Sequence, residues 1–312
     1  MKRDKAVLLL IFNRADTIAE VMRVLQRVRP SRLYIAADGP RVARDDERRL
    51  CREARSTVLD MINWPCELQT LFRDSNLGCA KAVAEGITWF FDHEEDGIIL
   101  EDDCLPHHSF FEFCSQMLDQ FKDDHEVMHI SGFRDVNEDT ADASYFFSHY
   151  PRIWGWATWR RAWQHFSLQP LLPTRELKEK IIRSCFYGHH NAGNQWFKDF
   201  EKSYARLSSW DYQWCLAIWL RQALSVNAST PLVKNIGFDE RGTHTTDSQN
   251  ASDLRALQLT SFTLPVIHPR TRAPHKANDV RAFKRHLDPD LLTRAKLKWR
   301  DAVKGMRRNY NL

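Results

Sequence analysis

The chain has 312 residues, 43% hydrophobic and 28% charged, which is the composition of an ordinary globular protein with a substantial core. Its net charge of +4 is uneven, because residues 270–312 carry thirteen Lys or Arg against four acids and the remainder carries −5. No stretch approaches the length of a membrane-spanning helix, and no internal repeat or low-complexity segment is present.

The N-terminal part alternates predicted strands with predicted helices. The apolar run 6–12 superficially resembles a signal peptide, but it is short and lacks a small-residue cleavage site, so we interpret it as a first strand. Further strands are expected at 33–37, 66–72 and 97–100, and helices at 17–28, 45–60, 79–93 and 110–121. This alternation predicts an α/β fold with a Rossmann-like, mostly parallel central sheet and helices on both faces.

The pattern changes after about residue 127. Short strands are expected at 128–132 and 144–148, helices at 175–185 and 212–223, and a late strand at 228–236. Residues 268–278 contain two prolines and many cations and are typical of a linker, and apolar residues then recur at helical spacing over 292–306. We expect a main domain over 1–265, with halves 1–127 and 128–265, and a basic linker with an amphipathic helical tail over 266–312. The seven cysteines are scattered and odd in number, which fits reduced thiols in the cytoplasm.

The strand at 97–100 ends on three acids, Glu101, Asp102 and Asp103. Like charges at the end of a buried strand are costly unless a cation or a hydrogen-bonded ligand compensates them. Hard oxygen ligands suit Mg²⁺ or Mn²⁺, and these ions commonly bridge to substrate phosphates. The sequence therefore predicts a divalent-cation site at this sheet edge, with an acidic loop in water as the alternative.

Three other strand ends should lie on the same edge, where ligands bind in open α/β sheets. They contribute Phe12, Asn13 and Arg14 after the first strand, Asp38 after the second, and Arg73, Asn76 and Gly78 after the third. Asp38 could accept the imide N–H of a uracil, and Arg73 and Lys81 could neutralise phosphate. The helix that begins after Gly78 offers backbone N–H groups to an anion. Together these groups describe a crevice that reads a nucleotide at one end and holds a metal at the other.

In these segments the chain resembles the GT-A glycosyltransferases, in the family-2-like group of nucleotide-diphospho-sugar transferases, and especially the inverting N-acetylglucosaminyltransferase I type. The matching pieces span about residues 5–265, and they are listed here in order: residues 7–14, 76–78, 99–103, 155–156, 210–214 and 231–245. The resemblance implies a GT-A fold, with 1–127 as the nucleotide-binding half and 128–265 as the acceptor and lid half. It also implies that Asp103 binds the metal directly and that Asp102 faces the ribose, whereas the role of Glu101 is the least defined.

Sugar transfer with inversion needs a carboxylate that takes the proton of the incoming hydroxyl. Asp211 is the candidate, because it stands between Trp210 and Tyr212 just before an apolar helix, where burial would raise its proton affinity. A helix N-cap is the alternative role for Asp211. Asp239 or Glu240 remain alternative bases.

The loop 235–245 contains two glycines, a cation and a histidine, a composition that suits a lid over a bound nucleotide sugar. In the resembling enzymes this loop orders on donor binding, so Arg241 could touch the diphosphate and His244 could complete the metal shell. Trp156, with Trp154, could stack on a donor or acceptor sugar, and core packing is the alternative for each.

We therefore expect a metal-dependent, inverting glycosyltransferase of polysaccharide biosynthesis that takes a nucleotide-diphosphate sugar, with UDP as the nucleotide, and a saccharide or lipid-linked acceptor. A sugar-nucleotide nucleotidyltransferase is the alternative, although residues 13–16 replace the glycine-rich loop it would carry after the first strand. A catalytically inactive module that binds a membrane or partner through its tail is a second alternative. The basic tail is a candidate for attachment to the inner face of the plasma membrane, with a solvated helix as the plain alternative and no nucleic acid expected as partner.

Overall fold

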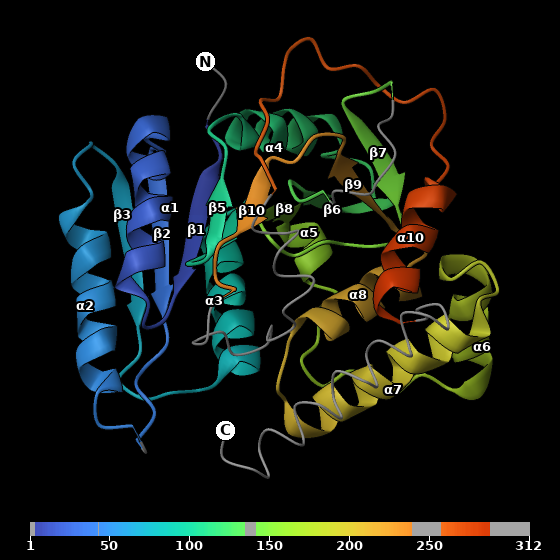
Figure 1. Ribbon diagram of the computed structural model, residues 1–312, viewed down its shortest axis with the longest axis horizontal. Coiled ribbons are helices and arrows are strands. Elements are labelled where there is room, and N and C mark those ends of the chain that lie inside the picture. The colour runs from blue at the N-terminus through green and yellow to red at the C-terminus, as the bar shows by residue number, and fades with distance from the viewer. Residues whose placement is uncertain (1–3, 43, 135–141, 239–256, 288–312) are drawn as a thin grey trace, which may run out of the picture.

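The computed structural model of the protein describes residues 4–42, 44–134, 142–238 and 257–287 (Figure 1). Its centre is an eight-stranded sheet in the order β3-β2-β1-β4-β8-β6-β9-β7, in which β8 and β7 run against the other strands. Helices cover both faces of this sheet, so the predicted mostly parallel α/β fold is confirmed.

The first half of the chain forms one run of parallel strands joined by helices. Its elements are β1 (Ala6–Ile11), α1 (Ala15–Val28), β2 (Arg32–Ala37), α2 (Glu47–Asp60), β3 (Glu67–Phe72), α3 (Cys79–His93) and β4 (Asp96–Glu101). All six residues of β1 are apolar and buried, as expected for a central parallel strand that is covered on both faces.

The second half extends the sheet and adds a group of helices beside it. Its elements are β5 (Cys104–Pro106), α4 (Ser109–Gln120), β6 (Val127–Ser131), β7 (Tyr145–Ser148), β8 (Trp156–Trp159), α5 (Arg160–Trp163), α6 (Arg175–Cys185), α7 (His190–Arg206), α8 (Asp211–Leu220), β9 (Leu224–Ala228), β10 (Val233–Asn235) and α10 (Lys276–His286). Figure 1 shows α1 and α2 at one end of the molecule and α6 and α7 at the other.

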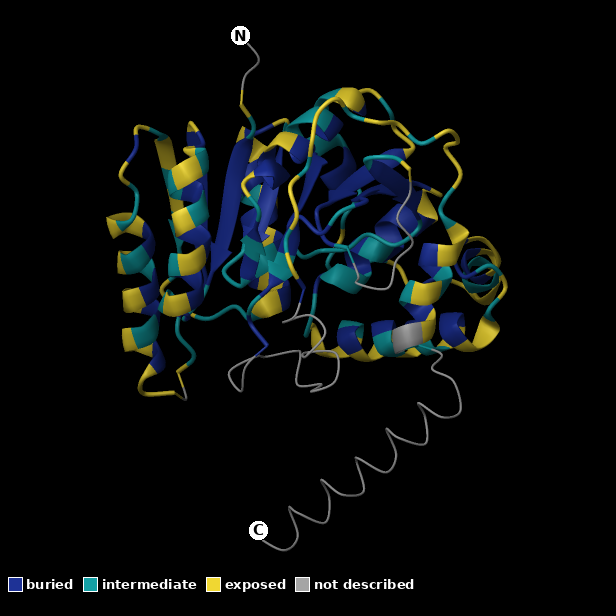
Figure 2. Ribbon diagram, turned by 45° about the horizontal axis from the view of Figure 1, so that its top comes forward, coloured by how far each residue is buried: buried dark blue, intermediate teal, exposed yellow. Residues whose placement is uncertain are grey.

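Two hydrophobic cores lie on opposite faces of the sheet, because successive side chains of a strand point to opposite faces. Val7, Leu9 and Ile11 of β1 pack into the core that includes α1, α2 and α4. Leu8 and Leu10 pack into the core that includes α3 and α6 to α8. In Figure 2 the central strands are accordingly dark blue, whereas the outward faces of the flanking helices are yellow.

The strand order reverses between β1 and β4. From β1 the chain passes through α1 and α2 to β2 and β3 on one side, and α3 then returns it to β4 on the other side of β1. Such a switch point leaves a crevice beyond the carboxyl ends of the two central strands, which is where open α/β sheets bind their ligands.

A second, two-stranded sheet ties the two halves of the chain together beside this switch point. β5 begins directly after the acidic triplet and pairs antiparallel with β10, with Asn235 opposite Cys104. The backbone N–H of Ile236 also donates to the carbonyl of Asp103 over 2.8 Å. Residues from the end of β10 are therefore held against the acids that end β4.

Several expected elements differ in the structure. The expected late strand 228–236 is observed as a separate strand only over Val233–Asn235, which form β10, because β9 ends at Ala228. The sheet also contains β8, where no strand was expected. The long helix α7 was not expected at all. The described part of the chain has no helix that is long and apolar enough to cross a membrane.

Residues 266–287 are packed on the body, although we expected a linker over 268–278. The side chain of Asp279 in α10 is buried and accepts hydrogen bonds from the hydroxyls of Ser148 and Tyr187 and from the backbone N–H of His149. The backbone N–H of His275 donates to the carbonyl of Phe147 over 2.7 Å. The expected tail helix over 292–306 lies outside the described residues, and the domain boundary at 265 stays a prediction.

Candidate functional site

A cleft of about 930 Å³ opens beyond the carboxyl ends of β1 and β4, at the switch point of the sheet. Residues that follow β1, β2, β3 and β4 line it from one half of the chain, and residues that precede α8 and follow β10 line it from the other. The cleft brings together most of the residues that the sequence pointed to. These are Phe12, Asn13, Arg14, Asp38, Arg73, Asn76, Gly78, Glu101, Asp102, Asp103, Trp154 and Asp211.

The acidic triplet is fixed by bonds to the end of β1. Asp102 Oδ2 accepts a hydrogen bond from the backbone N–H of Phe12 over 3.1 Å. Asp103 Oδ2 pairs with Nη1 of Arg14 over 3.3 Å, and the Arg14 side chain is almost fully buried. Both bonds join the two residues that follow β4 to the turn after β1, so the ends of the two central strands hold these carboxylates in the cleft.

All three carboxyl groups bind protons more tightly than usual. Burial raises the pKa of Glu101 well above its ordinary range, and the neighbouring charges of Asp103, Asp102 and Asp211 add to this. Burial, with the charge of Asp103, raises the pKa of Asp102 to about 7. Burial also raises the pKa of Asp103, against the opposing effect of Arg14. A group of carboxylates that resists ionisation is one that an added cation would stabilise.

Gly237 brings the backbone after β10 into contact with the triplet. Its N–H donates to Oδ1 of Asn235 over 2.7 Å. A Cβ at this position would overlap the carboxylate of Asp103 and the guanidinium of Arg14, so only glycine allows this close approach. In the sequence Gly237 belongs to the expected lid loop, and the two glycines of that loop are the one signal for this close approach.

Asp211 enters the cleft from the other half of the chain. It is the first residue of α8, whose N-cap is Trp210, so the alternative role of Asp211 as N-cap does not apply. Asp211 and Glu101 both line the cleft, and the charge of Asp211 contributes to the raised pKa of Glu101. The site thus combines a carboxylate cluster on β4 with a further carboxylate from a separate element.

Asp38 has a structural task that the sequence did not predict. Its Oδ1 accepts from the backbone N–H groups of Gly39 and Leu77, each over 2.9 Å, and its Oδ2 accepts from Gly78 N over 3.1 Å and from Asn76 Nδ2 over 2.8 Å. These bonds use the acceptor capacity of the carboxylate to hold the loop before α3. In this arrangement Asp38 shapes the cleft wall and has no acceptor left for a base imide.

The remaining predicted phosphate contacts divide into two groups. Arg73 lines the cleft and pairs with Glu85 over 3.2 Å. Lys81 does not line the cleft, because its half-exposed side chain lies 3.7 Å from Glu85 on the same helix. Arg73 therefore remains a candidate contact, and Lys81 is displaced from the site in this structure.

Trp156 does not reach the cleft either. It is fully buried and stacks between His129 and Trp210, with ring centroids 5.0 and 5.6 Å away. Trp156 therefore packs in the core, which was the alternative role expected for it. Trp154 does line the cleft, and its ring packs edge-on against Phe133 and Phe238.

The predicted lid residues lie outside the described part of the chain. Arg241 and His244 belong to this group, as do the alternative bases Asp239 and Glu240. Phe238, the last described residue before them, is buried against Phe133 and Leu257. The expected roles of Arg241 and His244 stay predictions.

Two further charged residues of the cleft wall carry no recognisable signal in the sequence. Glu47 and Arg41 line the cleft together with Asn13. The Arg41 guanidinium lies over the ring of Phe12, with its Cζ 5.4 Å from the ring centroid. In the sequence they belong to a stretch of many charges, 41–49, in which nothing distinguishes a buried carboxylate from a solvated one.

The carboxylates of the cleft fit a divalent cation that would take its remaining ligands from a substrate and from water. Among the described residues no three His, Cys, Asp or Glu side chains are gathered as a ready-made metal site. Mg²⁺ and Mn²⁺ are commonly bound through one or two carboxylates with phosphate oxygens and water as the other ligands. Asp103 is the carboxylate suited to this, since its side chain remains about one-fifth exposed in the cleft.

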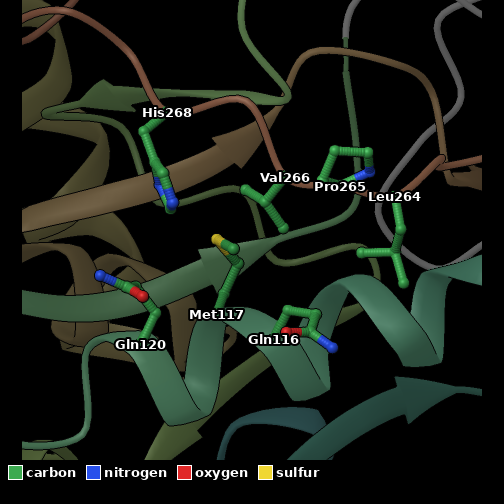
Figure 3. A pocket seen from close by; sticks show the side chains of 7 residues that line it. All are labelled: Gln116, Met117, Gln120, Leu264, Pro265, Val266 and His268. Atoms are coloured by element: carbon green, nitrogen blue, oxygen red, sulfur yellow. The ribbon is translucent and has the colours of Figure 1, made fainter.

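A second cavity of about 650 Å³ lies between α4 and the segment 264–268 (Figure 3). It is lined by Gln116, Met117, Gln120, Leu264, Pro265, Val266 and His268. Its lining includes the imidazole of His268 but no carboxylate and no cysteine, so it lacks the acidic side chains that line the cleft at the switch point.

Comparison with known proteins identifies no family model and no curated protein that matches this sequence. Among solved structures, UDP-glucose pyrophosphorylase complexed with UDP-glucose aligns at 7% identity and a TM-score of 0.36, covering 72% of this chain and 90% of that one. The 4-diphosphocytidyl-2C-methyl-D-erythritol synthase from Anaerococcus prevotii DSM 20548 aligns at 8% identity and 0.37, covering 81% and 97%. HddC from Yersinia pseudotuberculosis aligns at 10% identity and 0.30, covering 50% and 77%. Similarities this low decide nothing about activity.

Proposed function

We propose that this protein is a glycosyltransferase that transfers a sugar from a nucleoside-diphosphate donor, with inversion at the anomeric carbon. The observation that supports it is the meeting of two separate sets of carboxylates in one cleft: the triplet after β4 and Asp211 at the start of α8. The cleft is large enough for a nucleotide sugar. It also lies at the switch point, where the ends of β1 and β4 present backbone and side-chain groups to a ligand.

The diphosphate end of the donor would lie over Asp103. Asp103 would hold Mg²⁺ or Mn²⁺ together with the diphosphate oxygens, and the cation would supply charge stabilisation for the leaving nucleoside diphosphate. Arg14, which pairs with Asp103, and Arg73 are among the cations that line the cleft, and either can neutralise phosphate.

Asp211 would act as the general base. The acceptor hydroxyl oxygen forms a bond to the anomeric carbon, its proton passes to the Asp211 carboxylate, and the bond from that carbon to the β-phosphate oxygen breaks. The nucleoside diphosphate leaves with the bonding electron pair. A saccharide or a lipid-linked saccharide is the acceptor class we propose, because both supply such a hydroxyl.

Nucleotidyl transfer is the alternative chemistry for the same cleft. It would join a nucleoside triphosphate to a sugar phosphate and release pyrophosphate, and a glycine-rich loop after the first strand would commonly hold the triphosphate. In this protein only three residues, Phe12 to Arg14, separate β1 from α1, and none of them is glycine. This short turn favours glycosyl transfer.

The experiment that tests the proposal follows the fate of nucleotide sugars. The full chain is incubated with UDP-, GDP-, dTDP- or CMP-linked sugars and Mn²⁺, first with a panel of saccharide and lipid-linked acceptors and then with pyrophosphate. Glycosyl transfer predicts release of free nucleotide, at a rate that an acceptor increases. Nucleotidyl transfer predicts formation of nucleoside triphosphate only when pyrophosphate is present, by reversal of its reaction.

Three variants identify the roles of the carboxylates. Asp211→Asn should lower nucleotide release by at least about 100-fold while leaving donor binding nearly unchanged, since a general base contributes about that much. Asp103→Ala should abolish the Mn²⁺ dependence of donor binding. Asp92→Asn, which changes an exposed carboxylate on α3 away from the cleft, is the matched control. Wild-type activity in Asp211→Asn would remove Asp211 as the base.

A further inference from the structure

Glu47 is a buried carboxylate with partners from two different turns of the cleft wall. Its side chain is 1% exposed, although glutamate is rarely buried without a specific partner. Oε1 accepts from Nδ2 of Asn13 over 3.0 Å, and Oε2 accepts from the backbone N–H and from Nε of Arg41, each over 2.8 Å. Nη2 of Arg41 also donates to Oε1.

These bonds keep Glu47 ionised. Hydrogen bonds from Arg41 lower the pKa of Glu47 against the opposing effect of burial. Glu47 is also the first residue of α2, where the partial positive charge of the helix N-terminus favours a carboxylate. An ionised carboxylate accepts hydrogen bonds and donates none.

This acceptor-only character decides how Asn13 is oriented. The amide nitrogen of Asn13 must face Glu47, so its carbonyl oxygen is directed away from Glu47 and is left as an acceptor. Arg41 is held by the same carboxylate with its guanidinium over the ring of Phe12. Glu47 thus fixes an acceptor and a cationic donor next to an aromatic ring on the wall of the cleft.

We propose that Glu47 is a positioning residue that orients Asn13 and Arg41 to recognise the nucleoside part of the donor. The edges of nucleobases place donors next to acceptors, so they are complementary to an amide oxygen beside a guanidinium. Asp38 is committed to the loop 76–78 and leaves this task to other groups. The inference rests on the proposed function, because it assumes a nucleotide in the cleft.

The test separates nucleoside recognition from phosphate binding. Calorimetric titration with UDP, GDP, CDP and dTDP in the presence of Mn²⁺ first identifies the nucleoside diphosphate that the unchanged protein binds. The Kd of this nucleotide and the Kd of pyrophosphate with Mn²⁺ are then measured for Glu47→Gln. The control is Glu53→Gln, which changes an exposed glutamate of the same helix that pairs with Arg49 over 2.6 Å.

We expect Glu47→Gln to raise the Kd of the nucleoside diphosphate at least tenfold and that of pyrophosphate less than twofold, with Glu53→Gln unchanged in both. A second measurement excludes a merely structural role. Glu47→Gln is introduced into an Asn13→Ala, Arg41→Ala double variant, where it should cause no further loss of nucleotide affinity, because the residues through which it acts are gone.

Two results would overturn the inference while the proposed function stands. These are an unchanged nucleotide Kd in Glu47→Gln, and equal weakening of pyrophosphate and nucleotide. An additive loss in the triple variant would likewise make Glu47 a structural residue. If the unchanged protein binds none of the four nucleotides, the inference and the proposed function both fall.

Discussion

Nδ1 of His129 accepts a hydrogen bond from the indole N–H of Trp214 over 3.1 Å. Because an indole nitrogen only donates, this imidazole nitrogen carries no proton, and the other ring nitrogen donates to the carbonyl of Arg152 over 3.0 Å. His129 is therefore held neutral in the core between the sheet and α8. Its burial lowers its pKa to about 3.

His129 makes the fold sensitive to mild acid. In the unfolded chain a histidine binds a proton near pH 6.5, whereas in the folded protein His129 does so only near pH 3. The unfolded state therefore binds more protons between these values, and stability is lost as pH falls through this window, by about 1.4 kcal/mol per pH unit from this residue. Urea unfolding at pH 5, 6, 7 and 8 measures the slope.

The contribution of His129 is isolated by comparison with variants, because buried carboxyl groups with raised pKa values act in the opposite sense. His129→Asn should be less stable than the unchanged protein at pH 8 but should lose less stability on acidification. His125→Asn, which changes an exposed histidine, should keep the original slope. Equal slopes in all three proteins would contradict a neutral buried His129.

Asp38→Asn should reduce stability without changing base preference. The amide would turn an N–H group towards the backbone donors of Gly39 or Gly78, leaving some of them unsatisfied. We expect a loss of about 2 kcal/mol in the free energy of unfolding. Titration with UDP, GDP, CDP and dTDP then separates the two roles of Asp38. If the order of affinities for these nucleotides changed in Asp38→Asn, Asp38 would contact the base.

Gly237→Ala should damage the cleft directly. Its new methyl group would displace the Asp103 carboxylate or the Arg14 guanidinium, at a cost of about 1–3 kcal/mol. We expect a lower melting temperature and the loss of Mn²⁺-dependent nucleotide binding. Gly188→Ala is the control, because a Cβ there meets open space and costs only the strain of a positive φ. If Gly237→Ala bound nucleotide as tightly as the unchanged protein, the close contact of Gly237 with Asp103 and Arg14 would be contradicted.

The two neighbouring tryptophans should respond differently to truncation. Trp156→Ala removes a fully buried ring and should lower the free energy of unfolding by about 3–5 kcal/mol. Trp154→Ala removes a ring that lines the cleft and should raise the KM for the donor sugar with a smaller loss of stability. Chemical denaturation together with donor kinetics measures both. If Trp156→Ala instead raised the KM for the donor sugar without lowering stability, Trp156 would contact the donor and the core-packing role would be wrong.

Much of the first half of the fold could be predicted because its central strands and the inward faces of most of its helices are apolar and buried. β1 is an unbroken apolar run, and α1 has five buried residues at regular helical spacing. The boundaries of α3 and α6 agree with the predicted helices. The acidic triplet could be placed at a sheet edge because the strand before it ends where the charges begin.

The second half was harder because tertiary contacts decide its elements. The four residues of β8 are recognisable as a strand only by their pairing with β4 and β6. The helix α7 did carry a signal, with Ala192, Trp196, Phe197 and Phe200 buried on one face. The role of Asp38 depends on a loop nearly forty residues away, and that of Glu47 on two separate turns, so neither could be read from local sequence.

The hydrogen bonds that Asp279 accepts determine where the chain can be shortened. A protein cut at residue 265 would lose α10 and leave Ser148, Tyr187 and His149 without their shared acceptor, so its failure to bind vesicles would report damage to the body. Truncation after Leu287 keeps this helix and removes only the basic C-terminal segment. Flotation with anionic vesicles, comparing that shorter chain with the full one, therefore measures the tail itself.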